Sequence, residues 1–231
     1  MSDLARRLGV DKSSVSRLLR TLEQSNLVSQ DDATRGYTLG LHLFHLGQKV
    51  ARRLDVRRIA KSVLAALVVR TQECAHLAIL SGGRALYVDQ ATPERGVSVD
   101  APVGTLAPLH CTALGKVLLA FQSQSHIDDV LERVTLETFT RRTLRDASSL
   151  RAHLAEVRQQ GVAFDDEEFS VGVRCVAAPV FRHDGSVAGA IGISGPSPRV
   201  TDDRLLDWTP FILQQARGLS LQMGWAAERA A

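Results

Sequence analysis

Cysteine and long apolar runs are both scarce in this 231-residue chain. The three cysteines, Cys74, Cys111 and Cys175, are an odd number and lie far apart, which excludes a disulfide framework and indicates a reducing compartment such as the cytoplasm. No stretch of roughly eighteen apolar residues occurs, and the N-terminus lacks the charged and then apolar pattern of a secretory signal. We therefore expect a soluble cytoplasmic protein that does not bind a membrane.

Closely spaced pairs of cysteine and histidine, which mark zinc sites, are also missing. The residues that a metal site would have to use are scattered along the sequence: Cys74, His76, His110, Cys111 and Cys175. We therefore expect neither a metal nor another cofactor.

Positive charge is concentrated at one end of the chain. The formal net charge is only +3, but residues 1–58 hold eleven Lys and Arg against six Asp and Glu, a charge of +5. The remaining residues hold 17 basic against 19 acidic groups, a charge of −2. A basic head on a mildly acidic body indicates phosphate binding at one end and a different task at the other.

Residues 2–24 predict a helix-turn-helix. A short helix over residues 4–8, which Ser2 and Asp3 can cap, precedes a turn at Gly9 and a second helix from Asp11 to about Gln24. Apolar residues repeat at helical spacing in the second helix and can seat it against the first. Its outer face carries hydroxyls and cations that suit DNA phosphates and guanine edges in a major groove. They are Lys12, Ser13, Ser14, Ser16, Arg17 and Arg20.

A predicted hairpin follows directly. Residues 27–30 and 37–39 read as strands around a polar turn that carries Arg35. A hairpin after a recognition helix makes a winged helix-turn-helix, whose wing reaches the DNA backbone or minor groove. Residues 1–40 therefore predict a winged DNA-binding domain.

A linker and a larger domain complete the chain. Residues 41–54 predict a linker helix, which can pack either against a second copy of itself or against its own body. Residues 55–231 predict an α+β domain with helices over 55–71, 112–121 and 146–160, and a final helix from Thr201. Strands are expected over residues 75–80, 84–90, 97–99, 173–181 and 187–194, the last two joined by a turn at residues 183–185. Antiparallel strands flanked by helices predict a cupped sheet that can hold a small molecule.

Several stretches occur in the order and spacing of a known family. They are residues 18–23, 36–40, 109–116, 164–168, 172–180 and 193–196. The chain resembles the IclR family of bacterial transcriptional regulators over nearly its whole length. The resemblance implies a winged head, a linker helix and a GAF-like effector-binding domain. It also implies homodimers or homotetramers that bind double-stranded operator DNA and repress or activate nearby operons, often for catabolism of organic acids.

The head differs from the family at its start. Family members usually have another helix before the one that begins at Ser2, and that helix completes the three-helix core. Without it, four leucines lose partners and expose apolar surface: Leu4, Leu8, Leu18 and Leu22. Two explanations are open: either the true start site lies upstream of Met1, which we favour, or this head folds poorly and binds DNA weakly.

The resemblance also implies an effector site in the body. Matched residue by residue, the candidate contacts are Gly104, Thr105, Leu106, Asp165, Val173, Cys175, Gly192 and Ser194. Backbone N–H groups around Gly104 and at the N-terminus of the helix after Cys111 would suit a small carboxylate. Asp165 would repel a carboxylate, so it is expected to accept from a ligand hydroxyl or to orient the donors.

A different function class has to be weighed. Cys175, His110 and Asp165 are the residue types of a cytosolic thiol-dependent hydrolase. A cysteine in mid-strand is usually a small buried hydrophobe, however, and no local feature marks Cys175 as activated. We therefore expect a regulator that is not an enzyme, and its operator binding is expected to respond to a small organic acid.

Overall fold

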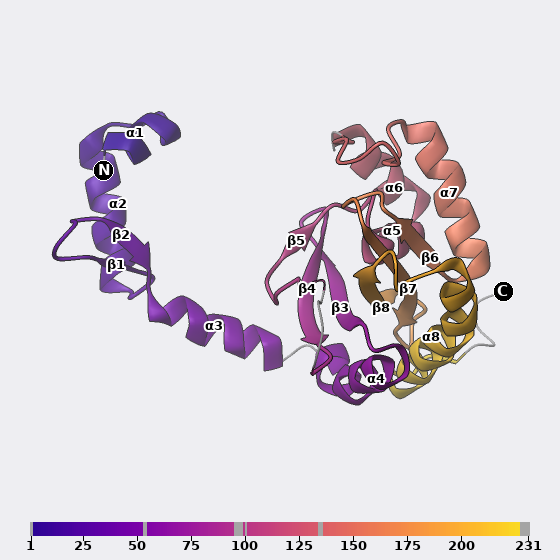
Figure 1. Ribbon diagram of the computed structural model, residues 1–231. Helices are drawn as coiled ribbons and strands as arrows, with labels where there is room; N and C mark the ends of the chain where they lie inside the picture. Colours follow the sequence, from indigo (N-terminus) through magenta and orange to yellow (C-terminus); the bar gives the residue numbers. More distant parts are fainter. Residues whose placement is uncertain (1, 53–54, 95–98, 100, 134–135, 227–231) are drawn as a thin grey trace. The chain divides into compact units, whose positions relative to one another are not determined.

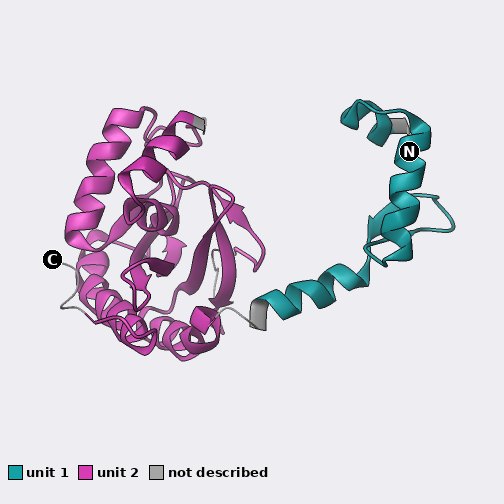
Figure 2. Cartoon of the chain, turned by 180° about the vertical axis from the view of Figure 1, so that it is seen from behind, with its two compact units in different colours: residues 1–54 teal, residues 55–231 magenta. Residues whose placement is uncertain are grey.

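The computed structural model describes residues 2–52, 55–94, 99, 101–133 and 136–226 (Figure 1). The chain divides into two compact units, residues 1–54 and residues 55–231 (Figure 2). The α+β class predicted from the sequence is confirmed. No helix in the described ranges is long and apolar enough to span a bilayer.

The first unit is a winged helix-turn-helix followed by one further helix. Its elements are α1 (Ser2–Leu8), α2 (Lys12–Gln24), β1 (Val28–Gln30), β2 (Tyr37–Leu39) and α3 (Leu41–Arg52). Strands β1 and β2 are antiparallel. A small core forms where Ala5, Val15 and Leu19 are buried against Val28 and Tyr37. This core packs both helices and the wing into one body.

The start of α1 differs from the prediction. Ser2 and Asp3 already belong to the helix and do not cap it. An acidic residue in the first turn is stabilised by the helix dipole, and here Asp3 forms ion pairs with Arg6 and Arg7.

Three of the four leucines expected to lack partners in the head are exposed. The exposed fractions are 38% for Leu4, 57% for Leu8 and 50% for Leu18, whereas Leu22 is half-buried. Large apolar side chains normally lie inside a small domain, and here Leu4, Leu8 and Leu18 are left in contact with solvent.

The second unit is built on a six-stranded antiparallel sheet in the order β5-β4-β3-β8-β7-β6. Its strands are β3 (Cys74–Ser81), β4 (Arg84–Ala91), β5 (Leu106–Ala107), β6 (Ala163–Asp166), β7 (Val173–Phe181) and β8 (Val187–Pro196). Its helices are α4 (Asp55–Thr71), α5 (Ala113–Ala120), α6 (Gln124–Arg133), α7 (Ala147–Gln160) and α8 (Asp202–Gln222). Helices α4 and α8 pack on one side of the sheet, and α5, backed by α7, packs on the other (Figure 1).

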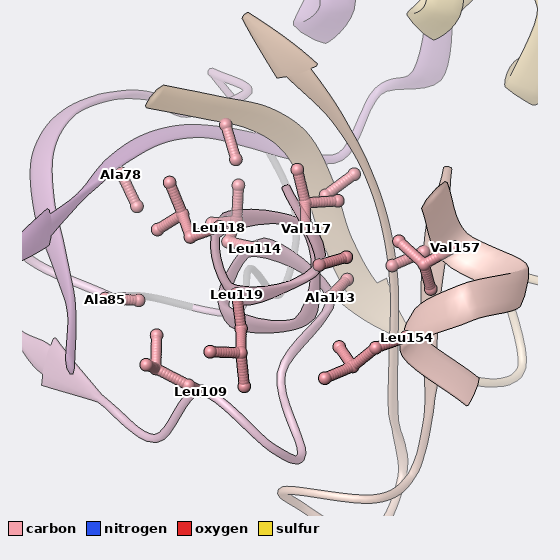
Figure 3. Packing of buried hydrophobic residues seen from close by; sticks show 14 of the residues in the cluster. Ala78, Ala85, Leu109, Ala113, Leu114, Val117, Leu118, Leu119, Leu154 and Val157 are labelled. Atoms are coloured by element: carbon pink, nitrogen blue, oxygen red, sulfur yellow. The ribbon is translucent and has the colours of Figure 1, made fainter. Parts of the chain in front are cut away.

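The main apolar cluster surrounds α5. All eight residues of this helix are buried. Leu114, Val117 and Leu118 lie among side chains of the sheet such as Ala78, while Leu154 of α7 closes the outer side (Figure 3). Apart from Lys116, the residues of α5 are apolar or glycine on every side, which is typical of a helix enclosed by other elements. Helix α5 is therefore packed between the sheet and α7.

Short elements account for the main differences from the prediction. Strands β5 and β6 have two and four residues, too few for a periodic pattern, and helix α6 was not predicted either. Of the strand expected at residues 97–99, residues 97 and 98 lie outside the described residues, and Val99 is not in a strand. Thr112 was expected inside a helix but is its N-cap.

Candidate nucleic-acid interface and ligand cavity

The second helix of the head begins at a strong cap. Asp11 accepts hydrogen bonds from the backbone N–H of Ser14 at 2.9 Å, from the Ser14 hydroxyl at 2.7 Å and from the Ser13 hydroxyl. These hydrogen bonds, that from Ser13 first, lower the pKa of the Asp11 carboxyl well below its usual range. The hydroxyls of Ser13 and Ser14, predicted to meet DNA, therefore donate to Asp11 in the free protein and retain only acceptor capacity.

The predicted cations of the head are free to meet phosphate. Lys12, Arg17, Arg20 and Arg35 are all exposed, and none of them forms an ion pair with an acid among the described residues. Ser16 lies on the same helix and is half-buried. Cations without a partner retain their full charge for DNA.

The wing presents Arg35 at its turn. Arg35 has a φ of +55° and donates its backbone N–H to the Asp31 carbonyl oxygen at 2.8 Å. The Asp31 side chain accepts from the backbone N–H of Thr34 at 2.7 Å and from its hydroxyl at 2.8 Å. This Asx turn fixes the backbone of the wing tip and leaves the Arg35 side chain in solvent.

Gly40 stands where the wing returns to the head. A Cβ at this position would lie 2.1 Å from the carbonyl oxygen of Asn26. The backbone N–H of Gly40 donates to the Leu27 carbonyl oxygen at 2.8 Å. Only glycine permits this close approach of two backbone segments.

The body contains a cavity of about 210 Å³ between the sheet and the N-terminal end of α5. Five of the eight predicted effector contacts line it, namely Asp165, Val173, Cys175, Gly192 and Ser194. An engineered protein cavity of about 150 Å³ is known to take a benzene ring, so this cavity suits a small molecule. Neither Lys nor Arg is among its described lining residues.

The other three candidates lie outside the lining. The N–H of Gly104 donates to the Tyr87 carbonyl oxygen at 2.8 Å, and that of Thr105 donates to the Pro102 carbonyl oxygen at 3.0 Å. Leu106 belongs to β5 and is 53% exposed. The expectation of free backbone donors around Gly104 was therefore wrong, because the Gly104 N–H pairs with β4 and the Thr105 N–H pairs with Pro102 within its own turn.

Further lining residues were not predicted. They include His76 on β3, Tyr87 on β4, and Thr112 and Ala113 at the N-terminus of α5. The His76 Nε2 atom lies 2.8 Å from the Ser194 hydroxyl oxygen in a hydrogen bond, and its ring lies edge-on to Tyr87. The available signal was a histidine inside the otherwise apolar start of β3.

A buried charged cluster lies against the cavity. Asp165, 3% exposed, accepts from the backbone N–H of Glu168 at 2.8 Å. Glu168 pairs with Lys116, whose side chain is fully buried in α5. The hydroxyl of Thr143 donates to the Glu168 carbonyl oxygen at 2.7 Å and holds this turn in place. Burial is the main cause that raises the pKa of both Asp165 and Glu168.

The thiols near the cavity are not nucleophiles. Burial raises the pKa of Cys111 to about 12 and that of Cys175 well above its usual range, so both remain protonated. His110 is hydrogen-bonded through Nε2 to the Glu137 carbonyl oxygen at 2.9 Å and does not line the cavity. The three residues of the hydrolase hypothesis are thus not arranged as a catalytic set. In the described ranges, no group of three or more His, Cys, Asp or Glu side chains is placed to hold a metal ion.

A winged helix-turn-helix and a separate α+β unit with a cavity are the arrangement of a transcriptional regulator with an effector-binding domain. Residues 1–32 match the IclR helix-turn-helix domain, and residues 48–221 match the C-terminal domain of bacterial IclR transcriptional regulators. The chain belongs to the IclR family. It is a DNA-binding transcriptional regulator and not an enzyme.

Individual proteins support this assignment. The chain is 34% identical to the HTH-type transcriptional regulator XynR of Escherichia coli over 98% of this chain and 90% of that protein. The crystal structure of an IclR regulator from Alicyclobacillus acidocaldarius, 30% identical, superposes with a TM-score of 0.82 over 96% of this chain and 90% of that one. An IclR homologue from Microbacterium hydrocarbonoxydans, crystallised with 4-hydroxybenzoate, shares the fold at 22% identity, with a TM-score of 0.79 over the same shares.

Proposed function

We propose that this regulator is an operator switch controlled by a small organic acid. The observation that carries the proposal is the cavity of about 210 Å³, which combines apolar walls with a few hydrogen-bonding groups. A cavity of this size and composition is typical of a site for one small, partly polar molecule. Family membership supports control of a catabolic operon, by repression or by activation.

The DNA contacts follow from the exposed face of α2 and from the wing. We assign base reading to Arg17 and Arg20, phosphate binding to Lys12 and to the wing residue Arg35, and close packing in the groove to three serines. These serines are Ser13, Ser14 and Ser16. Because chromosomal DNA is the partner, the proposed place of action is the cytoplasm.

Two copies of the chain are needed for this role. One winged head contacts too few base pairs for a specific operator, so a homodimer or a homotetramer is expected to bind an inverted repeat. The apolar side chains Leu43, Leu46 and Val50 repeat at helical spacing on α3 and are 38%, 40% and 61% exposed. Such a stripe on a linker helix supports pairing with a second copy.

Ligand and DNA are coupled through the assembly in this proposal. An acid in the body favours one arrangement of the subunits and thereby changes the separation of the heads. A coupling free energy of about 1–3 kcal/mol would change operator affinity by roughly 5- to 150-fold.

Fluorescence anisotropy with DNA from upstream of the gene tests this function. Random DNA is the control, and the panel contains small carboxylic acids, with 4-hydroxybenzoate included because it occupies a protein of the same fold. Operator-specific binding that one acid shifts is the expected result. Binding without any response to acids would remove the effector part of the proposal, and equal affinity for random DNA would remove the operator part.

A further inference from the structure

The ligand cavity presents an electrostatic problem to any carboxylate. Among its described lining residues, Asp165 is the only acid, and Lys and Arg are absent. The buried cation in this region, Lys116, is committed to Glu168. An anionic ligand would place a second carboxylate beside Asp165 with no unpaired cation to offset it. Two carboxylates that share a buried site do not both remain ionised.

We propose that Asp165 binds the effector as a neutral carboxylic acid, whose O–H donates to the effector carboxylate, so that one proton is taken up from solvent with each acid bound. The inference rests on the proposed function, in which the effector is a small carboxylic acid. No covalent bond changes in this step. The proton comes from water or buffer, resides on Asp165 in the complex, and returns to solvent when the acid leaves.

The position of Asp165 makes it ready to hold a proton. Its Oδ1 atom accepts from the N–H of Glu168 at 2.8 Å and more weakly from Phe169 at 3.4 Å, which fixes the carboxyl group at the cavity wall. Burial raises the pKa of Asp165 to about 7, and the Glu168 carboxylate adds to the rise, against the opposing effects of these N–H groups and of Lys116. Near neutral pH, the acid form is therefore already well populated.

Six titratable or charged groups surround Asp165, and most of them are poor candidates to take up the proton in its place. They come from β3, β4, the segment before α5, α5 itself, the turn after β6, and β7: His76, Tyr87, Cys111, Lys116, Glu168 and Cys175. Burial raises the pKa of the phenol and of both thiols, so these three remain neutral near pH 7. Glu168 forms an ion pair with Lys116. His76 is hydrogen-bonded to the Ser194 hydroxyl, and mutation of each residue distinguishes Asp165 from His76 as the group that takes up the proton.

The proposal fixes the pH dependence of acid binding. Below the pKa of free Asp165, the proton is already present, so affinity for an acid is constant and no proton is taken up. Above that pKa, each complex must acquire a proton, and the dissociation constant rises with pH. For one group that titrates at about 7, the dissociation constant increases about 30-fold between pH 5.5 and pH 8.5. A neutral amide of the same shape has no such dependence.

Isothermal titration calorimetry on the full chain tests the inference. The probes are acetate, pyruvate, benzoate and 4-hydroxybenzoate, each beside its amide, at pH 5.5, 7.0 and 8.5. At each pH, two buffers that titrate near that pH and differ in their heats of ionisation give the number of protons taken up. Asp165→Asn removes the titrating group but keeps its shape, and His76→Gln is the matched control on the same cavity.

Proton uptake that rises from near zero at pH 5.5 to nearly one at pH 8.5 is expected for acids and not for amides. This uptake should disappear in Asp165→Asn and persist in His76→Gln. Acid binding without proton uptake, or uptake that survives in Asp165→Asn, overturns the inference and leaves the regulator function intact. If Asp165→Asn does not fold, the comparison of acid with amide on the native chain decides. Failure of all acids to bind either protein at pH 5.5 overturns the inference together with the organic-acid effector.

Discussion

Lys116 connects the core of the body to the ligand cavity through an ion pair. It is the one charged side chain in α5, and it is fully buried. It forms an ion pair with Glu168, whose backbone N–H donates a hydrogen bond to Asp165. A buried charge without a partner is far more costly than the same charge in an ion pair. The pair therefore fixes the position of this turn against the helix.

Breaking the pair on one side should destabilise the body. Lys116→Met leaves the Glu168 carboxylate buried and unpaired, and we expect a loss of about 3–5 kcal/mol in the free energy of unfolding, measured in urea. The double variant Lys116→Met/Glu168→Leu should recover most of that loss, because two apolar side chains leave no unpaired charge buried in the site. Glu168 can escape its burial by protonation, so its pKa in the single variant rises and the loss is larger at pH 8 than at pH 5. A double variant as unstable as the single one would contradict this account.

Gly192 has two roles in the structure that its sequence position alone does not distinguish. It was predicted as an effector contact, and it does line the cavity. A Cβ there would lie 2.3 Å from the Val176 carbonyl oxygen, so close packing between β8 and β7 already requires glycine. One sequence cannot separate a residue that is retained for strand packing from one that is retained for a ligand.

At the scale of elements, the starts of α2 and α7 were predicted to within one residue because their signal is local, although Asp11 and Asp146, which were expected as the first residues of these helices, are their N-caps. Asp11 before α2 and Asp146 before α7 begin the same pattern, in which two serines follow at the third and fourth positions. Asp146 accepts from the Ser149 N–H at 2.8 Å and from the Ser148 hydroxyl at 2.6 Å, and these hydrogen bonds lower its pKa to about 2. The hairpin of β7 and β8 was predicted for a similar reason, since its turn residues are distinctive.

Other elements could not be predicted, and they carry part of the cavity. Strand β6 has only four residues, yet it supplies Asp165 through its pairing with β7. His76 was missed because both faces of β3 are buried, so its alternation gives no sign of which face meets the cavity. Gly104 and Thr105 were misplaced because their pairing with Tyr87 is a long-range contact without a local signal. Tertiary packing, which is absent from the local pattern, decides these positions.

Removing each of the two similar caps, Asp11 in the head and Asp146 in the body, tests whether DNA binding depends on the head alone. Asp11→Ala removes the cap of the recognition helix and should lower operator affinity several-fold, because the first turn of α2 loses its fixed geometry. Asp146→Ala should lower the thermal stability of the body and leave operator affinity unchanged. Asp11→Asn, which keeps the cap without the charge, should bind DNA at least as tightly as the native chain. Anisotropy and amide exchange in α2 and α7 measure these effects, and an equal loss of DNA binding in both alanine variants would count against the assignment.

At the scale of the whole molecule, charge separates the two tasks. The first 58 residues carry a formal charge of +5 and the rest −2, so the attraction to DNA resides in the basic end of the chain. The body adds little to that attraction and is free to respond to a small ligand. In the proposed DNA complex, specificity is expected to come from the few side chains of α2 that are assigned to base edges.

Salt dependence distinguishes the two kinds of contact within that basic end. Arg35→Ala on the wing should weaken binding to operator and random DNA alike and lower the salt slope by about one for each head bound, because a phosphate contact releases one counterion. Arg17→Ala on α2 should weaken operator binding by about 1–3 kcal/mol and random DNA much less, since a base contact is lost. Arg70→Ala in the body, where Arg70 pairs with Asp207, is the control and should change neither. Equal losses on both DNAs in Arg17→Ala would make Arg17 a phosphate contact and leave base reading to Arg20 and the serines.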